Sequence, residues 1–228
     1  MVMSRFAFSA LIAITLTHAL PAQARPVSIA LVGDSLANDL GNGMEDIFAG
    51  RRDVHVIKRT QFATGLVRTD YFNWDATVDN ALKHGDANIL VVVLGGNDHQ
   101  PIRVNGKRLD PLSNAWRAEY SRRVARFMKT VKQSRAKLYW VGLPDVRSEK
   151  LANGYRVMNR IFKQQAAKNG FTYIDIWNKF HTPHGAYSSF GKSLEGVNRR
   201  IRKEDGMHFT EPGRKLFANY VARSIGLR

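Results

Sequence analysis

The chain changes from strand to helix in the stretch Val27-Ser28-Ile29-Ala30-Leu31-Val32-Gly33-Asp34-Ser35-Leu36. Its first six residues are mostly apolar and β-branched, which is typical of a buried strand. Residues 37–48 then carry apolar side chains at helical spacing. A serine at this junction lies at a helix N-terminus, where backbone N–H groups and the helix dipole favour a developing negative charge. The alternative is that Asp34 or Ser35 only caps the helix, because Gly-Asp-Ser is a short and common sequence.

Four further apolar runs follow, and segments with apolar residues at helical spacing separate them. The run at 89–94 is aliphatic throughout, which predicts a central strand covered on both faces. Such alternation predicts one α/β domain with a five-stranded parallel sheet between helices, and ligands bind beyond the carboxyl ends of its strands. The predicted strands are 27–32, 54–57, 88–94, 137–143 and 171–177, and the predicted helices are 39–48, 75–84, 114–134, 151–169 and 211–224.

The N-terminus has the pattern of a cleavable secretory signal peptide. Arg5 is the only charged residue before position 25, a short apolar stretch at 6–16 follows it, and Ala22-Gln23-Ala24 is a small-x-small cleavage site. The apolar stretch is too short to span a bilayer, and an uncleaved anchor is the alternative. We therefore predict a signal peptide at 1–24, a single mature domain at 25–228 without a transmembrane segment, and a periplasmic or secreted location.

Composition limits the partners and cofactors of this chain. It has 228 residues, a formal net charge of +16 and no cysteine, which excludes disulfides and thiolate metal sites. His181 and His184 are loosely spaced and have no accompanying carboxylate pattern, so we expect no metal. The positive charge suits an anionic partner. For an exported protein this favours an anionic envelope polymer over nucleic acid, and a general surface bias without a partner is the alternative.

Four short groups of glycines and polar residues follow the predicted strands or the long loop at 178–206. Because the carboxyl ends of parallel strands meet at one edge of a sheet, we expect these groups to lie together. Part of the long loop is expected to form a short hairpin around Gly191 and Gly196. The four groups are Gly33-Asp34-Ser35-Leu36, Ala63-Thr64-Gly65-Leu66-Val67-Arg68, Gly95-Gly96-Asn97-Asp98 and Asp205-Gly206-Met207-His208-Phe209-Thr210.

Each group contains a residue type that acyl-transfer chemistry needs. A serine hydroxyl becomes a nucleophile when a base takes its proton, and we predict His208 to be the base for Ser35. Asp205, three residues earlier, is close enough to hold the imidazole in one tautomer. The oxyanion of a tetrahedral intermediate needs preorganised donors. The predicted donors are the backbone N–H groups of Ser35 and Gly65 and the side-chain amide of Asn97.

In this order, the four groups resemble the sequence blocks of the SGNH (GDSL-type) hydrolases, and they span nearly the whole mature chain. The resemblance implies a flavodoxin-like three-layer sandwich and ester hydrolysis without a metal or other cofactor. It also implies a Ser35, Asp205 and His208 triad with an oxyanion hole from Ser35, Gly65 and Asn97. The stretches 64–68, 70–74 and 205–210 are similar to a bacterial envelope subgroup of uncharacterised function.

Several residues near these groups have two interpretations. Arginine binds a carboxylate or phosphate through paired hydrogen bonds, but a solvated charged face is as common. Phe72 and Trp74 suit either a sugar-stacking platform or the core, whereas Asp34 and Asp98 are expected to order their own loops. The candidates for substrate binding are Arg68, His99 and Arg200, with Arg199 and Arg202 beside them in sequence.

The predicted function is an exported serine esterase. We expect it to hydrolyse an acyl ester, with O-acetyl as the expected group, on an envelope or extracellular carbohydrate. One alternative is an O-acyltransferase that passes the acyl group to a sugar hydroxyl. A lipase or lysophospholipase with an apolar groove is another, and a non-catalytic glycan-binding module is the last. The residues around Ser35 do not distinguish the substrates.

Overall fold

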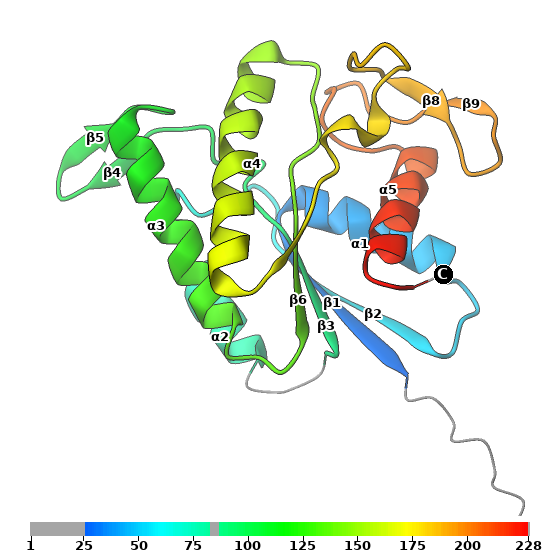
Figure 1. The fold of residues 1–228 in the computed structure, drawn as a ribbon, viewed down its shortest axis with the longest axis horizontal. Coiled ribbons are helices and arrows are strands. Elements are labelled where there is room, and N and C mark those ends of the chain that lie inside the picture. The colour runs from blue at the N-terminus through cyan, green and yellow to red at the C-terminus, as the bar shows by residue number, and fades with distance from the viewer. Residues whose placement is uncertain (1–25, 83–86, 228) are drawn as a thin grey trace, which may run out of the picture.

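The computed structural model describes residues 26–82 and 87–227, so the predicted signal peptide at 1–24 lies outside the described residues. All five predicted strands are present in one parallel sheet with the order β2-β1-β3-β6-β7 (Figure 1). This is the flavodoxin-like order, so the predicted fold class is confirmed. The strands are β1 (Val27–Gly33), β2 (Val54–Thr60), β3 (Ile89–Val93), β6 (Lys137–Val141) and β7 (Thr172–Ile174).

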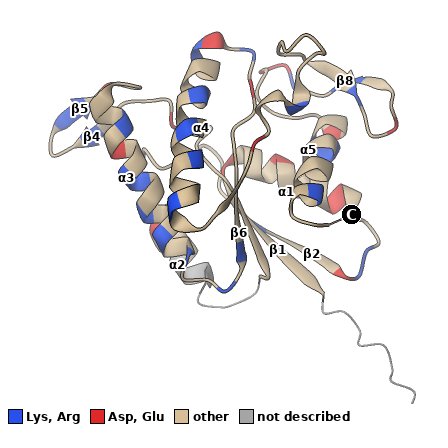
Figure 2. Ribbon diagram, in the orientation of Figure 1, with Lys and Arg blue, Asp and Glu red and all other residues tan. Residues whose placement is uncertain are grey.

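Helices cover both faces of the sheet. Figure 1 shows α1 and α5 packed together on one face and α2, α3 and α4 on the other. Lys and Arg residues are spread along α3 and α4 (Figure 2). None of the helices in the described residues is long and apolar enough to cross a membrane. The bounds are α1 (Ser35–Ile47), α2 (Trp74–Leu82), α3 (Asn114–Val131), α4 (Glu149–Asn169) and α5 (Glu211–Ser224).

Several boundaries differ from the prediction by a few residues, and two of the differences have clear local reasons. Helix α1 begins at Ser35, earlier than the predicted residue 39, because Asp34 caps it and accepts the N–H of Leu36 at 3.0 Å. Strand β7 ends at Ile174, and Trp177 begins a 3₁₀ turn, η1 (Trp177–Phe180). The prediction of a strand through residue 177 was therefore too long.

The sheet brings the ends of β1 and β3 close together. Every residue of β3 is buried, as its aliphatic run predicts. Gly33 pairs with Val93 at the carboxyl ends of these strands. A Cβ on Gly33 would lie 1.8 Å from the Val93 carbonyl oxygen, and the φ of Gly33 is +147°. Only glycine fits there, because any side chain would collide with the Val93 carbonyl. The segments that follow β1 and β3 therefore start close to each other.

Two hairpins extend from the sandwich. The predicted hairpin in the long loop is present as β8 (Phe190–Lys192) and β9 (Asn198–Arg200). The second consists of β4 (Ile102–Val104) and β5 (Lys107–Leu109), which were not predicted. Asn105 and Gly106 connect them with φ values of +49° and +75°. Positive φ at both positions is the requirement of a tight type I′ turn, which fixes the pairing of the two strands.

Candidate active site

Ser35, His208 and Asp205 form a hydrogen-bonded chain at the carboxyl edge of the sheet. The Oγ of Ser35 lies 2.8 Å from Nε2 of His208, across 173 positions of sequence. The Nδ1 of the same ring lies 2.7 Å from Oδ2 of Asp205. The serine is the first residue of α1, and the histidine lies three residues before α5. Packing of α1 against α5 therefore brings these two distant segments of the chain together.

A tight turn holds Asp205 against the imidazole. Its Oδ1 accepts the backbone N–H groups of Met207 at 2.8 Å and His208 at 3.0 Å, which leaves Oδ2 for the ring. Gly206 has a φ of +71°, and a Cβ there would lie 2.5 Å from the Cβ of Arg147. The spacing Asp-Gly-Met-His therefore fixes the carboxylate before any substrate binds.

The charge on Asp205 is maintained to low pH. Partial burial raises the pKa of its carboxyl, but hydrogen bonds from the His208 ring and from the backbone N–H groups of Met207 and His208 outweigh burial and lower the pKa to about 2. An ionised partner favours the tautomer of His208 that has a proton on Nδ1 and an available Nε2.

An Asp205→Asn substitution is expected to change how stability depends on pH. The pKa of Asp205 lies below the ordinary value of 3.8, so its ionised form stabilises the fold above about pH 4, and this contribution is lost as the pH falls toward about 2. The variant lacks this contribution, so its free energy of unfolding is expected to fall less over that interval. Urea unfolding of both proteins at a series of pH values measures the difference, and parallel curves would contradict it.

Two further groups position the turn that carries His208. Asp39, one helical turn after Ser35 on α1, accepts the backbone N–H of Phe209 at 2.9 Å. Arg202 donates to the carbonyl oxygens of Met207 at 2.7 Å and Asp145 at 2.8 Å. Its side chain is 1% exposed, and its guanidinium carbon lies 3.9 Å from the ring centroid of Phe209. The interpretation of Arg202 as a substrate ligand is therefore wrong, because the side chain is buried inside the protein, where two of its nitrogens already donate to carbonyl oxygens.

Asp34 joins two of the predicted groups. Besides capping α1 through Oδ1, it accepts the backbone N–H groups of Gly95 at 3.1 Å and Gly96 at 2.9 Å through Oδ2. The side chain is fully buried, and burial raises its pKa to about 7 against the effect of these hydrogen bonds. The carboxyl group thus orders the loop, as predicted, and sets the loop after β3 against the N-terminus of α1.

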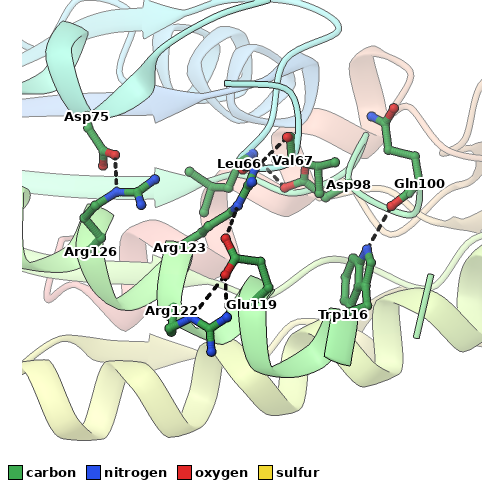
Figure 3. Close-up of polar contacts among 10 residues, drawn as sticks. All are labelled: Leu66, Val67, Asp75, Asp98, Gln100, Trp116, Glu119, Arg122, Arg123 and Arg126. Carbon is green, nitrogen blue, oxygen red and sulfur yellow. Dashed lines mark hydrogen bonds and ion pairs between the residues drawn. The ribbon is translucent and has the colours of Figure 1, made fainter. Parts of the chain in front are cut away.

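Asp98 orders the loop that contains Gly65. Its two carboxylate oxygens accept the backbone N–H groups of Leu66 and Val67, both at 2.9 Å (Figure 3). A Cβ on Gly65 would lie 2.0 Å from Oδ1 of Asp98, so a side chain at this position would disrupt the contact. The amide of Asn97 donates one hydrogen to the carbonyl of Thr64 at 2.9 Å. A primary amide has a second hydrogen, which stays available to another acceptor.

Helix α3 braces this loop from behind, which the sequence interpretation missed. Tyr120 donates its hydroxyl to Asp98 at 2.8 Å. The Nη1 of Arg123 donates to the carbonyl of Val67 at 2.7 Å, and Glu119 accepts its Nε at 2.9 Å (Figure 3). Arg123 lies beside the apolar stripe of α3 and is 8% exposed. The position of this arginine next to an apolar stripe was the sequence signal for such a contact, because a buried guanidinium needs acceptors inside the protein.

The predicted substrate ligands lie outside the hydrogen-bonded chain. In the described parts, 26–82 and 87–227, no hydrogen bond or ion pair joins Arg68, His99 or Arg200 to Ser35 or His208. Arg68 pairs with Asp70 at 2.8 Å, and Arg200 pairs with Glu204 at 3.2 Å. His99 packs against Gly154 on α4, and burial followed by the charge of Lys150 lowers its pKa.

The aromatic and histidine candidates have internal contacts. Trp74 is 2% exposed and donates its indole N–H to Thr64 at 3.0 Å, so its role is in the core and a stacking platform is wrong for this residue. Phe72 packs edge-on against it with ring centroids 4.9 Å apart. The Nε2 of His181 lies 2.9 Å from the Asp145 carboxylate, whereas His184 is exposed in the following turn.

Comparison with known proteins places the chain in a family. Residues 28–224 match the sequence model described as protein of unknown function, DUF459. The chain belongs to this family. The match includes all four groups of the candidate site, and it runs from β1 to the end of α5. No curated protein sequence matches this DUF459 chain.

Solved structures share the fold at low sequence identity. An acetylxylan esterase from Geobacillus stearothermophilus, in a catalytic mutant form, is 13% identical with a TM-score of 0.61, and the match covers 90% of this chain and 96% of that one. A GDSL-like lipase from Bacteroides thetaiotaomicron is 13% identical with a TM-score of 0.59, covering 89% and 91%. A psychrotrophic esterase from Pseudoalteromonas sp. is 14% identical with a TM-score of 0.58, covering 87% and 96%. The predicted resemblance of this DUF459 chain to GDSL-type hydrolases is confirmed at the level of the fold.

Proposed function

We propose that this DUF459 protein is a serine esterase with Ser35 as nucleophile, His208 as base and Asp205 as the group that orients the base. The observation that carries the proposal is the continuous contact from Oγ of Ser35 through the His208 ring to Asp205, with distances of 2.8 and 2.7 Å. Nucleophile, base and orienting carboxylate in this arrangement support acyl transfer through a covalent acyl-enzyme.

In the proposed first half-reaction, Nε2 of His208 takes the proton from Ser35 as its Oγ bonds to the ester carbonyl carbon. The carbonyl oxygen becomes an oxyanion, for which the proposed donors are the N–H groups of Ser35 and Gly65 and the free amide hydrogen of Asn97. Ser35 is the first residue of α1, so its N–H has no acceptor within the helix. Losing one such donor typically raises the barrier by about 2.7–4 kcal/mol.

Collapse of the intermediate breaks the bond to the leaving alcohol, which receives the proton from His208. The product of this step is an acyl group esterified to Ser35. Water then attacks the acyl carbon while His208 takes a proton from it, and the second collapse returns that proton to the Ser35 oxygen and releases the acid. The ionised Asp205 stabilises the imidazolium formed in both halves.

We further propose that the substrate is an acylated, in particular O-acetylated, envelope or extracellular carbohydrate. The signal-peptide pattern at 1–24 supports export of the domain at 25–228, and the net charge of +16 suits an anionic polymer. One solved structure of this fold is an acetylxylan esterase, and another is an esterase inhibited by monoethylphosphonate.

Labelling with a fluorophosphonate probe tests the mechanism, since the probe reacts with an activated serine. We expect one label per chain, on Ser35 in wild type, and none in Ser35→Ala. A second assay compares esters from acetate to laurate, and we expect the highest kcat/KM for acetate. An unlabelled wild type would contradict the esterase proposal. A maximum at laurate would indicate a lipase, and acetyl groups recovered on an added sugar acceptor would indicate a transferase.

A further inference from the structure

A basic cleft lies behind the loops that carry the proposed oxyanion donors. It has a volume of about 590 Å³, and Arg68, Arg103, Arg108 and Arg123 line it. Asp70 is the single carboxylate among the described residues that line the cleft. Figure 2 shows the blue Lys and Arg positions on the β4–β5 hairpin, which forms one of its walls. The cleft therefore has an excess of positive charge that its own lining does not balance.

The hairpin holds two of these arginines directly opposite each other. Arg103 on β4 pairs in register with Arg108 on β5. Like charges in opposite positions of an antiparallel pair destabilise it. Arg108 is partly compensated by Asp110 at 2.9 Å, and both side chains are more than half exposed. The side chain of Arg103 has no ion pair or hydrogen bond with any group that the structure describes. An anion between the two guanidinium groups would relieve this repulsion.

On the other wall, both arginines are paired with carboxylates. Arg123 is held by Glu119 at 2.9 Å and by the Val67 carbonyl, so it fixes the shape of the cleft. Arg68 is paired with Asp70, although both side chains are more than half exposed. The positive charge open to a ligand is therefore concentrated on Arg103 and Arg108, which are both exposed.

The cleft is connected to the candidate active site through two short segments. Val67 lines the cleft and follows Gly65 by two residues, so their Cα atoms are at most about 7.6 Å apart. Gln100 also lines the cleft, and its amide donates to the carbonyl of Asn97 at 2.7 Å. The cleft and the proposed oxyanion donors therefore share the two segments 65–67 and 97–100.

We propose that this cleft binds a carboxylate or phosphate group of an acidic glycan whose acyl ester is cleaved at Ser35. Guanidinium groups bind both anions through paired, charge-assisted hydrogen bonds. The proposal rests on the esterase function proposed above and names the class of its substrate. Because the cleft and Ser35 belong to different segments, anion binding and hydrolysis can be measured separately.

Calorimetry on the Ser35→Ala protein tests binding without turnover. The two probes are an oligomer of galacturonate, which carries carboxylates, and an oligomer of glycerol phosphate. We expect at least one to bind, more weakly as salt rises. Adding Arg103→Gln and Arg108→Gln is expected to weaken that binding about tenfold or more, since hydrogen bonds to charged groups are lost. Whichever probe binds more tightly identifies the anionic group.

A matched control removes the same charge elsewhere. Arg135 and Lys137 are exposed at the start of β6, on the opposite edge of the sheet from the cleft. Arg135→Gln with Lys137→Gln is expected to leave affinity within about twofold of the parent, because exposed charges beyond about 10 Å are screened. Equal weakening in both double variants, or no binding of either oligomer, would overturn the cleft proposal.

Acetate release from acetylated polygalacturonate and from its methyl ester measures the effect on hydrolysis. The preference in kcat/KM for the acidic polymer is expected to fall about tenfold in the Arg103→Gln, Arg108→Gln protein with intact Ser35. An unchanged preference would overturn the cleft proposal while hydrolysis itself continued. An inactive wild type that still bound the oligomer would instead contradict the esterase proposal and retain the anion site.

Discussion

Replacing His208 with alanine is expected to lower kcat for acetate-ester hydrolysis by about 10⁶-fold, as is Ser35→Ala, and the double variant is expected to be no slower than either single variant. The reason is that the two side chains act as one unit through the 2.8 Å contact between Oγ and Nε2. Without the base the hydroxyl keeps its proton, and without the hydroxyl the base has nothing to activate. The activity that remains comes from substrate binding and the oxyanion donors.

Steady-state hydrolysis of p-nitrophenyl acetate by the four proteins measures this relation. His55→Ala is the matched control, because His55 is exposed on β2 and is expected to leave kcat within about twofold, as most surface substitutions do. Losses that multiply in the double variant would show that the two residues act independently. A His208→Ala protein with the activity of the control would contradict the proposed mechanism.

Replacing Asp98 with alanine is expected to lower the free energy of unfolding by roughly 3–5 kcal/mol, since several buried donors lose their acceptor at once. These donors are the backbone N–H groups of Leu66 and Val67 and the hydroxyl of Tyr120. The carboxyl is fully buried, so little water can replace it. The loop that contains Gly65 would then lose the contacts that order it, so esterase activity is expected to fall as well.

Tyr120→Phe is the matched control for this experiment, because it removes one donor and leaves the acceptor in place. Its expected cost is about 1 kcal/mol, the usual net value of one hydrogen bond. Urea unfolding of both variants gives the two free energies. An Asp98→Ala protein that is no less stable than Tyr120→Phe would show that Asp98 does not hold the loop.

The periodicity of the sequence was sufficient to predict the sheet and its helices. The aliphatic residues at 89–94 predicted the central strand, because a strand covered on both faces needs apolar side chains in both directions. The β4–β5 hairpin was missed although Asn105-Gly106 is a strong turn signal. Its strands have only three residues each, and two of the three in β5 are charged, so the apolar alternation is too short to indicate a strand.

The residues of the candidate site were predicted from the residue types at the strand ends. The contacts that hold these residues in place were not predicted. Ser35, Asp205 and His208 belong to short groups whose order along the chain is informative. The contacts of Asp98 with α3 depend on how a helix rests on a distant loop, which local patterns do not contain. Arg202 was interpreted as either a substrate ligand or part of a solvated charged face, yet it stacks on Phe209 inside the fold.

The separation of Ser35 and His208 in the chain has a consequence for when activity begins. Helix α1 with its serine is synthesised early, and the histidine comes 173 positions later, just before α5. A serine hydroxyl without a base is inert toward esters. Under the proposed mechanism, a growing or unfolded chain therefore does not hydrolyse esters, and hydrolysis starts only when α5 docks on α1. For a protein that we propose to be exported, the place where α5 docks on α1 therefore decides where activity begins.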